Sequence, residues 1–330
     1  MNTTLVLGAT GGMGGAIALE LVRRREPVRI LVRDAEKASR RFTDPRRVEA
    51  VKGDVFDEST LVPALKNVDV IYFGVNFPYA MWEQDFPRAA QAVINAAKSV
   101  GAAVVFPGNT WALGPASKTH YSEDAPNAPC CKKGVIRAEV ERMFREAAEK
   151  SGGRFQVINV RSAECFGPTI RNGVVKRVFE AAALKKPIKF IGRLAAPHQW
   201  AYAPDMARAT LDMVPIRARF APYEVVNFPG YTTPKQEQFL RMVAERAGRA
   251  TQQISASWGM VKFKALVSRE AKELLDLRHL YDGGVLLELG KLKKYAPAFK
   301  ATPAELAIDE TNVAFRKALE PAKTEEEEEE

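Results

Sequence analysis

A glycine pattern near the N-terminus is the first feature that could do chemistry. Gly8, Gly11 and Gly14 stand three residues apart, between an apolar run and a stripe of apolar residues at helical spacing. Glycine allows a tight turn and a close approach of the backbone, and the free amides at a helix N-terminus favour a pyrophosphate. The pattern therefore predicts a phosphate-binding turn, and a glycine-rich turn without a ligand is the alternative. The residues assigned to this turn are Gly8, Thr10, Gly11, Gly12, Met13 and Gly14.

The second apolar run, PVRILVRD, ends in a basic residue, Arg33, which Asp34 follows. A guanidinium forms charge-assisted bonds with a 2′-phosphate, whereas an acid at such a position binds the ribose hydroxyls of a dinucleotide. We therefore expect NADP rather than NAD as cofactor, and Asp34 keeps NAD open. Two further basic residues, Arg40 and Arg41, follow on the next predicted helix.

Runs of strand length alternate with helical stripes along the first two thirds of the chain. Further strands are predicted in RVEAVKGDVFD, VDVIYFGVN, AAVVFPGN and FQVINVRS, and helices at roughly 82–100 and 133–150. This alternation predicts an α/β fold with a doubly wound parallel sheet of the Rossmann type. Ligands bind such sheets at the carboxyl ends of the strands. Beyond the glycine turn and Arg33, the residues assigned to the cofactor on this edge are Asp54, Val55, Gly74 and Asn76.

The rest of the chain predicts a smaller lobe that covers the substrate. Its segment TPKQEQFLRMVAERAG opens with Thr-Pro and stops at a glycine, as a capped helix does. We expect a dinucleotide-binding domain at 1–227, with a substrate-lobe insertion at about 166–197. A mostly helical substrate lobe follows at 228–320, and a disordered acidic tail at 321–330, because six glutamates cannot bury apolar surface.

These motifs together resemble the extended short-chain dehydrogenases/reductases, which include sugar-nucleotide epimerases and dehydratases. The resemblance covers roughly residues 1–230. It rests on GATGGMG, GDVFD, YSEDAPNAP, AEVERMF, VRSAECFGP and WAYAPDMARATL, in that order. It implies that Gly8, Gly11 and Gly14 cradle the pyrophosphate and that Asp54 lies near the adenine.

The catalytic pattern of that family is replaced here. Lys133 stands at the position of its tyrosine and Arg137 at that of its lysine, and Asn109 stands at or beside that of its serine. KGVIRAEVE is similar to the lysine-to-arginine pattern of isoflavone-reductase-like and nitrogen-regulator-like proteins. In those reductases the first lysine is the proposed catalytic residue, whereas the regulators bind a dinucleotide without known turnover. Lys133 is thus a candidate for catalysis and for cofactor binding, and a solvated helix start is its alternative.

Glu164, in RSAECFGP, holds a position that faces the substrate in the family. A carboxyl group in an apolar pocket can act as acid or base. The alternative role is a structural ion pair with Lys133 or Arg137. The candidate catalytic residues are therefore Lys133, Asn109 and Glu164.

Aromatic residues in three predicted loops favour a small-molecule pocket. We expect Phe77, Tyr79, Trp82, Trp111, His198 and Trp200 to bind the substrate. Core packing is the alternative for the aromatic residues, and a packed, hydrogen-bonded residue is the alternative for His198.

Composition excludes several classes of protein. Apolar residues make up 46% and charged residues 27% of 330 residues, as in ordinary globular proteins. The net charge is +9, with 49 basic and 40 acidic side chains, but the basic residues are scattered, which favours solvated faces over a nucleic-acid site. Three cysteines are too few for a disulfide framework or a zinc site, so no metal is expected. Without a signal peptide or an apolar run of membrane length, we expect a cytoplasmic monomer or homodimer that binds no membrane.

We therefore expect an NADP-dependent oxidoreductase that lacks the usual Tyr-x-x-x-Lys pair and acts on a small carbonyl, enone or alcohol. Two alternatives stay open: a dinucleotide-binding sensor without turnover, and a redox-neutral epimerase or dehydratase.

Overall fold

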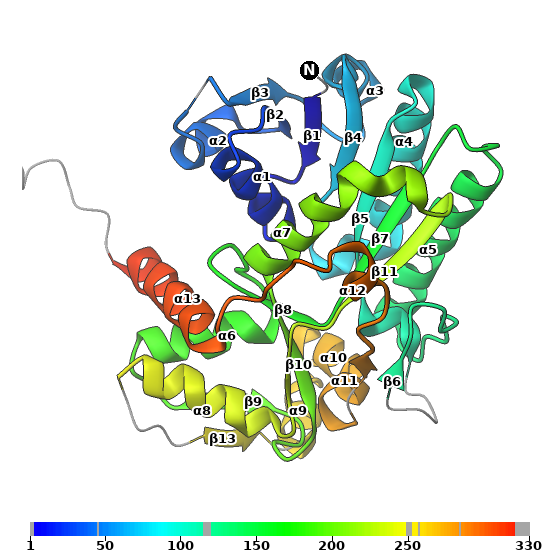
Figure 1. Cartoon of the computed structure of the whole chain (residues 1–330). Coiled ribbons are helices and arrows are strands. Elements are labelled where there is room, and N and C mark those ends of the chain that lie inside the picture. Colours follow the sequence, from blue (N-terminus) through cyan, green and yellow to red (C-terminus); the bar gives the residue numbers. More distant parts are fainter. Residues whose placement is uncertain are drawn as a thin grey trace, which may run out of the picture.

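The structure is a computed structural model of the whole chain (Figure 1). It describes residues 3–44, 46–114, 120–248, 253–256, 258–283 and 285–320. The predicted acidic tail at 321–330 lies outside the described residues. No helix among the described residues is both long and apolar enough to cross a membrane.

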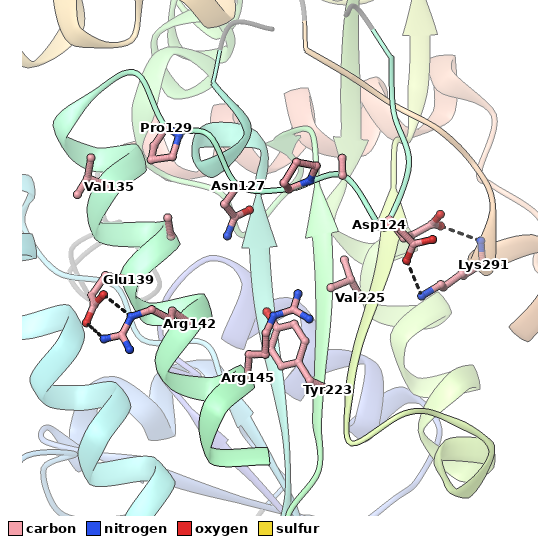
Figure 2. Close-up of a pocket in the computed structure, with 14 residues that line it drawn as sticks. Asp124, Asn127, Pro129, Val135, Glu139, Arg142, Arg145, Tyr223, Val225 and Lys291 are labelled. Carbon is pink, nitrogen blue, oxygen red and sulfur yellow. Dashed lines mark hydrogen bonds and ion pairs between the residues drawn. The ribbon is translucent and has the colours of Figure 1, made fainter. Parts of the chain in front are cut away.

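One large sheet organises the N-terminal two thirds of the chain. Its seven strands are all parallel and follow the order β11-β7-β5-β4-β1-β2-β3. The order reverses beside β1, which confirms the predicted doubly wound sheet. Strand β11 forms one edge, next to helix α5 (Figure 2). The strands are β1 (Thr3–Leu7), β2 (Val28–Val32), β3 (Val48–Lys52), β4 (Val68–Phe73), β5 (Ala103–Asn109), β7 (Val157–Ser162) and β11 (Tyr223–Phe228).

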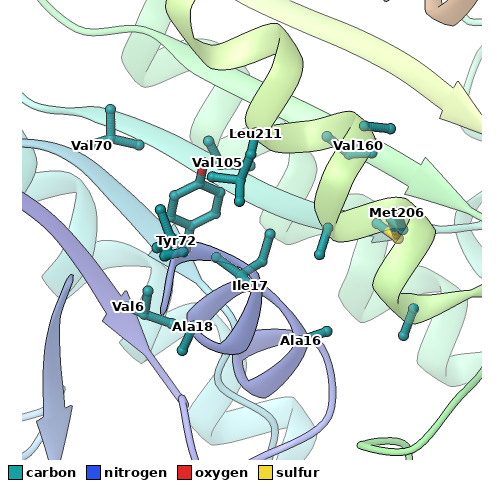
Figure 3. Packing of buried hydrophobic residues seen from close by; sticks show 14 of the residues in the cluster. Val6, Ala16, Ile17, Ala18, Val70, Tyr72, Val105, Val160, Met206 and Leu211 are labelled. Carbon is teal, nitrogen blue, oxygen red and sulfur yellow. The ribbon is translucent and has the colours of Figure 1, made fainter. Parts of the chain in front are cut away.

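Helices cover both faces of this sheet. On one face, α1 and α7 pack together over Tyr72, with Ile17 and Leu211 between them (Figure 3). On the other face, α4 and α5 pack over Phe73 and Phe106. The helices of this domain are α1 (Met13–Arg23), α2 (Ala35–Arg41), α3 (Glu58–Leu61), α4 (Trp82–Val100), α5 (Lys132–Glu149) and α7 (Ala203–Met213), with 3₁₀ turns at Pro63–Leu65, Tyr79–Met81, Thr110–Leu113 and Val214–Arg219.

The second lobe has its own core and combines helices with short strands. Phe166, Phe179, Trp200 and Phe239 form the centre of that core. Three small sheets belong here, in the orders β12-β10-β8, β13-β9 and β14-β6. The strands are β6 (His120–Tyr121), β8 (Glu164–Phe166), β9 (Ile188–Ile191), β10 (His198–Tyr202), β12 (Tyr231–Thr233), β13 (Gln253–Ala256) and β14 (Leu286–Leu287). The helices are α6 (Gly173–Ala183), α8 (Gln236–Arg246), α9 (Trp258–Lys264), α10 (Arg269–Asp276), α11 (Arg278–Asp282), α12 (Lys291–Tyr295) and α13 (Ala304–Leu319).

Candidate functional site

The turn between β1 and α1 depends on two glycines. Gly8 has a φ of 74°, and a Cβ there would lie 2.5 Å from the carbonyl oxygen of Gly74. A Cβ on Gly14 would lie 2.4 Å from the carbonyl oxygen of Gly8. Because both neighbours are backbone atoms, a side chain would force the turn open. The ends of β1 and β4 thus present bare backbone in front of α1, which fits a pyrophosphate.

Arg41, rather than Arg33, contacts this turn. Its Nη1 donates to the carbonyl oxygen of Thr10 at 3.0 Å, and a Cβ on Gly15 would lie 2.4 Å from its Nη2. Burial and the nearby Arg171 lower the pKa of Arg41. Arg33 is exposed, and no described residue forms an ion pair or a side-chain hydrogen bond with it. The segment that follows β2 thus supplies three guanidiniums: Arg41 is packed, Arg33 is free, and Arg40 is paired with Glu36.

Asp34 has a structural role at this edge. Its carboxylate accepts a hydrogen bond from the backbone amide of Lys37 at 3.0 Å and so caps helix α2. The capping bond occupies Oδ1 of Asp34, the acid whose presence allowed NAD as the alternative cofactor.

The loop after β3 places Asp54 and Val55 at the same edge. The Asp54 carboxylate accepts from the Phe56 amide at 3.0 Å and holds the loop in a turn. Val55 is buried. The ring of Phe56 stacks on Phe77 with centroids 5.5 Å apart. Phe77 therefore lies beside this loop. It does not line the cavity at the strand ends, the central cavity, which Gly12, Asn76 and Glu164 border.

A cavity of about 190 Å³ opens where the strand ends meet the second lobe. Gly12, Met13, Gly74 and Asn76 contribute the wall nearest the glycine turn. The rest of the lining comes from the segment 75–86, from β5 and the 3₁₀ turn that follows it, from α5, and from the segment 162–173. Of the predicted residues, the cavity thus brings together Gly12, Met13, Gly74, Asn76, Tyr79, Trp82, Asn109, Trp111 and Glu164.

Glu164 is the acid of this cavity. It begins β8 and belongs to the cavity lining. Burial raises the pKa of its carboxyl to about 7, and the Tyr281 hydroxyl donates a hydrogen bond to its Oε2 at 3.4 Å. No ion pair joins Glu164 to Lys133 or Arg137, so the predicted structural alternative is not formed. A carboxyl group with such a pKa can hold or release a proton near neutral pH.

Lys133 lies behind the cavity wall. Its side chain is 3% exposed and forms an ion pair with Glu273 of α10. Its Nζ also sits 4.5 Å from the centroid of the Tyr79 ring, and Tyr79 itself lines the cavity. The lysine therefore links the two lobes, and the structure does not place it among the residues that line the cavity.

Arg137 is one turn further along α5 and does line the cavity. It is 5% exposed, and its Nη2 donates to the carbonyl oxygen of Pro107. The guanidinium lies over the rings of Phe106 and Phe86, 4.6 and 5.1 Å from their centroids. Burial lowers the pKa of Arg137 to about 10, so it stays cationic at neutral pH.

Asn109 and two tryptophans shape the adjoining wall. The Asn109 side chain accepts from the amide of Trp111 at 3.0 Å and caps the 3₁₀ turn that follows β5. Trp82 and Trp111 stack with ring centroids 5.3 Å apart. Tyr79 packs against both rings. Asn109 thus positions an aromatic wall as well as facing the cavity.

His198 and Trp200 of β10 sit behind Glu164. His198 is 8% exposed, and burial lowers the pKa of its imidazole to about 4. Trp200 is 0% exposed, stacks on Phe239 at 4.1 Å, and donates from Nε1 to Thr233 at 3.1 Å. Neither residue is part of the central cavity's lining; Trp200 belongs to the core of the second lobe.

A larger hollow of about 660 Å³ lies on the outer side of α5 (Figure 2). Its charged groups are already paired. Arg142 binds Glu139, and Lys291 lies 3.7 Å from Asp124. Arg145 packs over the Tyr223 ring at 4.3 Å. The hollow lies away from the glycine turn, and paired charges offer a ligand little gain.

Several residues of the site were not assigned from the sequence. Tyr281 and Glu273 come from the second lobe, more than 110 residues from their partners, and no local pattern marks them. Arg41 and Arg137 were visible in the sequence, Arg137 at the position of the family's lysine, but neither was assigned to the site.

Solved structures with a similar fold include nucleotide-sugar epimerases. MoeE5, in complex with UDP-glucuronic acid and NAD, has a TM-score of 0.76 at 19% identity, over 97% of this chain and 100% of its own. The UDP-glucose 4-epimerase of Thermotoga maritima has a TM-score of 0.75 at 17% identity, over 97% and 100%. The UDP-glucuronic acid 4-epimerase of Bacillus cereus, in complex with NAD, has 0.75 at 15% identity, over 96% and 100%. At these identities the likeness shows the fold, and in fold the chain resembles the epimerases, as predicted.

Sequence comparison gives the family. No curated protein matches the chain. Residues 1–280 match the NmrA-like family, which confirms the nitrogen-regulator-like resemblance around Lys133. Because the match spans well over half of the 330 residues, the chain belongs to the NmrA-like family.

Proposed function

We propose that the chain binds NADP(H) along the glycine edge and reduces a small carbonyl or enone, or oxidises the corresponding alcohol. The observation that carries this proposal is the continuity of one cavity. The same 190 Å³ space is lined by Gly12 and Met13 of the glycine turn and by Glu164, whose carboxyl pKa is near neutral. A dinucleotide and a proton donor can therefore reach the same substrate.

The residues present fit a dinucleotide. Gly8 and Gly14 keep the turn tight, because a Cβ at either would collide with backbone, and the amides at the N-terminus of α1 that follow this turn suit a pyrophosphate. Bound nicotinamide would supply or accept the hydride. The chain's own part is to seal the cavity with aromatic rings and to hold a proton on Glu164 beside the substrate oxygen. In the oxidising direction the same carboxylate accepts that proton.

Two arginines favour NADP over NAD. Arg33 is free and exposed at the end of β2, and Arg41 already lies against the glycine turn. A 2′-phosphate between them would gain charge-assisted hydrogen bonds. The complexes of MoeE5 and of the Bacillus cereus epimerase contain NAD, so this chain would differ from both in cofactor.

Arg33→Ala and Arg41→Ala are each expected to weaken NADPH binding about ten-fold or more, because each removes a bond worth ~1.5–3 kcal/mol to the phosphate. NADH, which lacks the phosphate, should bind Arg33→Ala and the unchanged protein with nearly equal affinity, whereas Arg41→Ala also removes a contact of the glycine turn and should weaken NADH to a smaller extent. Calorimetric titration with the two nucleotides measures this. Lys37→Ala, on the same helix as Arg41, is the matched control. A preference for NADH in the unchanged protein would contradict the cofactor assignment.

One observation favours a sensor without turnover as the second candidate function. Glu273 neutralises Lys133 and ties α10 of the second lobe to α5 of the sheet domain. Lys133 is then a structural link whose rearrangement could report dinucleotide binding, and the protein would need no substrate. Incubating the NADPH-loaded protein with small aldehydes, ketones and enones separates the two functions. NADPH oxidation supports the enzyme, and tight NADPH binding without oxidation of NADPH by any of them supports the sensor.

Lys133→Ala is expected to lower the free energy of unfolding and to change the turnover little. The substitution leaves the Glu273 carboxylate without its partner, which costs ~1–3 kcal/mol, and toward the lower value because Glu273 is 30% exposed. Lys132→Ala, at an exposed neighbour, should change neither quantity. Urea denaturation and NADPH oxidation measure the two effects. A 100-fold loss of turnover at unchanged stability would instead place Lys133 in the reaction.

A further inference from the structure

Two buried arginines and one buried glutamate lie close to the cavity. Arg137, Arg161 and Glu141 are exposed by only 5%, 1% and 2%. The Glu141 carboxylate pairs with Arg161 at 3.4 Å and accepts a hydrogen bond from Asn127. No described carboxylate forms an ion pair with Arg137. Two buried guanidiniums therefore lie near one buried carboxylate, which pairs with Arg161 and acts on Arg137 only through its charge at longer range. The excess positive charge resides at Arg137.

Burying a charge without a partner costs free energy, because the protein interior solvates the charge less well than water does. The neighbours of Arg137 compensate it only in part. One carbonyl oxygen, that of Pro107, accepts from Nη2, and two aromatic faces lie beneath the guanidinium. Its Nε has no hydrogen-bond partner. The guanidinium therefore keeps N–H groups that no described protein group accepts.

The side chain of Arg137 borders the central cavity. Arg137 lines it together with Tyr79, Trp82 and Trp111. Aromatic walls with a fixed guanidinium suit a flat ring that carries a carboxylate, since the planar fork of arginine matches a carboxylate in two parallel hydrogen bonds. At about 190 Å³, the cavity is smaller than the ~300–1,000 Å³ of usual ligand sites. Because the nicotinamide end of the dinucleotide would enter the same space, only a small substrate, of about one ring, would fit beside it.

The other arginines of α5 show the contrast. Arg142 is paired with Glu139 and Arg145 packs on Tyr223 (Figure 2). Arg142 is also paired with Glu146, and Arg145 lies 3.8 Å from Glu149. The helix thus gives partners to its exposed arginines and leaves the buried one, which faces the cavity, without an acid.

We propose that Arg137 is an anion-binding residue of the cavity, and that the substrate is a small carbonyl compound, enone or alcohol with an aromatic or apolar ring and a carboxylate. This rests on the proposed function, because it assigns the substrate class to the same cavity. The guanidinium neutralises the carboxylate, and the aromatic walls hold the ring so that its reacting carbon faces the wall formed by Gly12, Met13 and Asn76.

Benzoate and its neutral isostere benzamide test the proposal by binding alone. With NADPH-saturated protein in a calorimeter, benzoate is expected to bind at least about ten-fold more tightly than benzamide. Arg137→Gln should reduce benzoate to the level of benzamide, and Arg137→Lys should keep part of the difference because a charge remains. Arg145→Gln, on the same helix but facing outward, should leave the difference intact. The melting temperature of each variant shows whether it is folded.

Equal binding of benzoate and benzamide to the unchanged protein would overturn the proposal, whether or not the variants fold. A loss of NADPH affinity in Arg137→Gln, with benzoate binding unaffected, would overturn it as well, by placing the guanidinium on the nucleotide. The proposed function fails separately, if the unchanged protein binds no NADPH. The same pair of ligands is then titrated into nucleotide-free protein, where the ten-fold difference still decides for or against the anion site.

Discussion

Glu164→Gln is expected to lower turnover about 100-fold or more. Glutamine keeps the shape of the side chain and can still accept the Tyr281 hydrogen bond, but it cannot give or take a proton. Loss of a positioned acid or base typically costs ~10²–10⁴-fold in rate. NADPH affinity should change little, because Glu164 belongs to β8 and is not part of the glycine turn. The measurement is NADPH oxidation with the best substrate of the panel of aldehydes, ketones and enones, beside calorimetric titration of NADPH.

The pH profile gives the same prediction a second readout. Reduction needs the protonated carboxyl, and the pKa of Glu164 is raised by burial to about 7. The reduction rate should therefore be full below pH 7 and fall as the pH rises through it, while oxidation should show the opposite slope. Glu164→Gln should remove this inflection. A variant that keeps both the rate and the inflection would show that another group transfers the proton.

Tyr281→Phe is a matched control, because it removes the hydroxyl that donates to Glu164 and leaves the carboxyl in place. That hydrogen bond lowers the pKa of Glu164 against the larger effect of burial. Its loss should move the inflection to higher pH, with a smaller change in the maximal rate than Glu164→Gln causes. A merely structural role for Tyr281 would change stability without moving the inflection.

The fold was largely predictable because its signals are local. Strand-length apolar runs alternate with helical stripes, and the observed helices Trp82–Val100 and Lys132–Glu149 agree with the predicted spans to within one residue. The glycine turn was predictable for the same reason. Gly8 and Gly14 are required by backbone contacts within one strand–turn–helix unit and with the neighbouring strand. Such local requirements are visible in the sequence as a glycine pattern.

The site was less predictable because its partners are distant in the chain. Lys133 was expected to meet Glu164 or the cofactor, yet it meets Glu273, 140 residues away. Glu164 meets Tyr281, 117 residues away. Nothing near either residue in the sequence specifies these partners, since they come from the second lobe. Aromatic residues raise a related ambiguity, because an aromatic ring can line a cavity or fill a core. Trp111 lines the cavity, whereas Trp200 belongs to the core of the second lobe.

Trp200→Ala is expected to destabilise the protein by about 3–5 kcal/mol, which is the usual cost of truncating a fully buried tryptophan. The side chain is 0% exposed, lies flat on Phe239 at 4.1 Å, and holds Thr233 through its indole nitrogen. Truncation would leave a void between β10 and α8 and remove the donor to that hydroxyl, which would keep only its bond to the His198 carbonyl oxygen. Urea unfolding followed by circular dichroism measures the loss.

Trp111→Ala is the comparison that separates packing from binding. Trp111 is half-buried and lines the cavity, so its truncation should lower stability less than that of Trp200 and weaken benzoate binding more. If Trp200→Ala costs less than about 1 kcal/mol and instead abolishes benzoate binding, Trp200 is a ligand residue and the core assigned to the second lobe is wrong. The opposite order of effects in the two variants follows from one physical difference. A ring enclosed by protein on all sides contributes its burial to folding, whereas a ring that faces a cavity keeps part of its surface for a ligand.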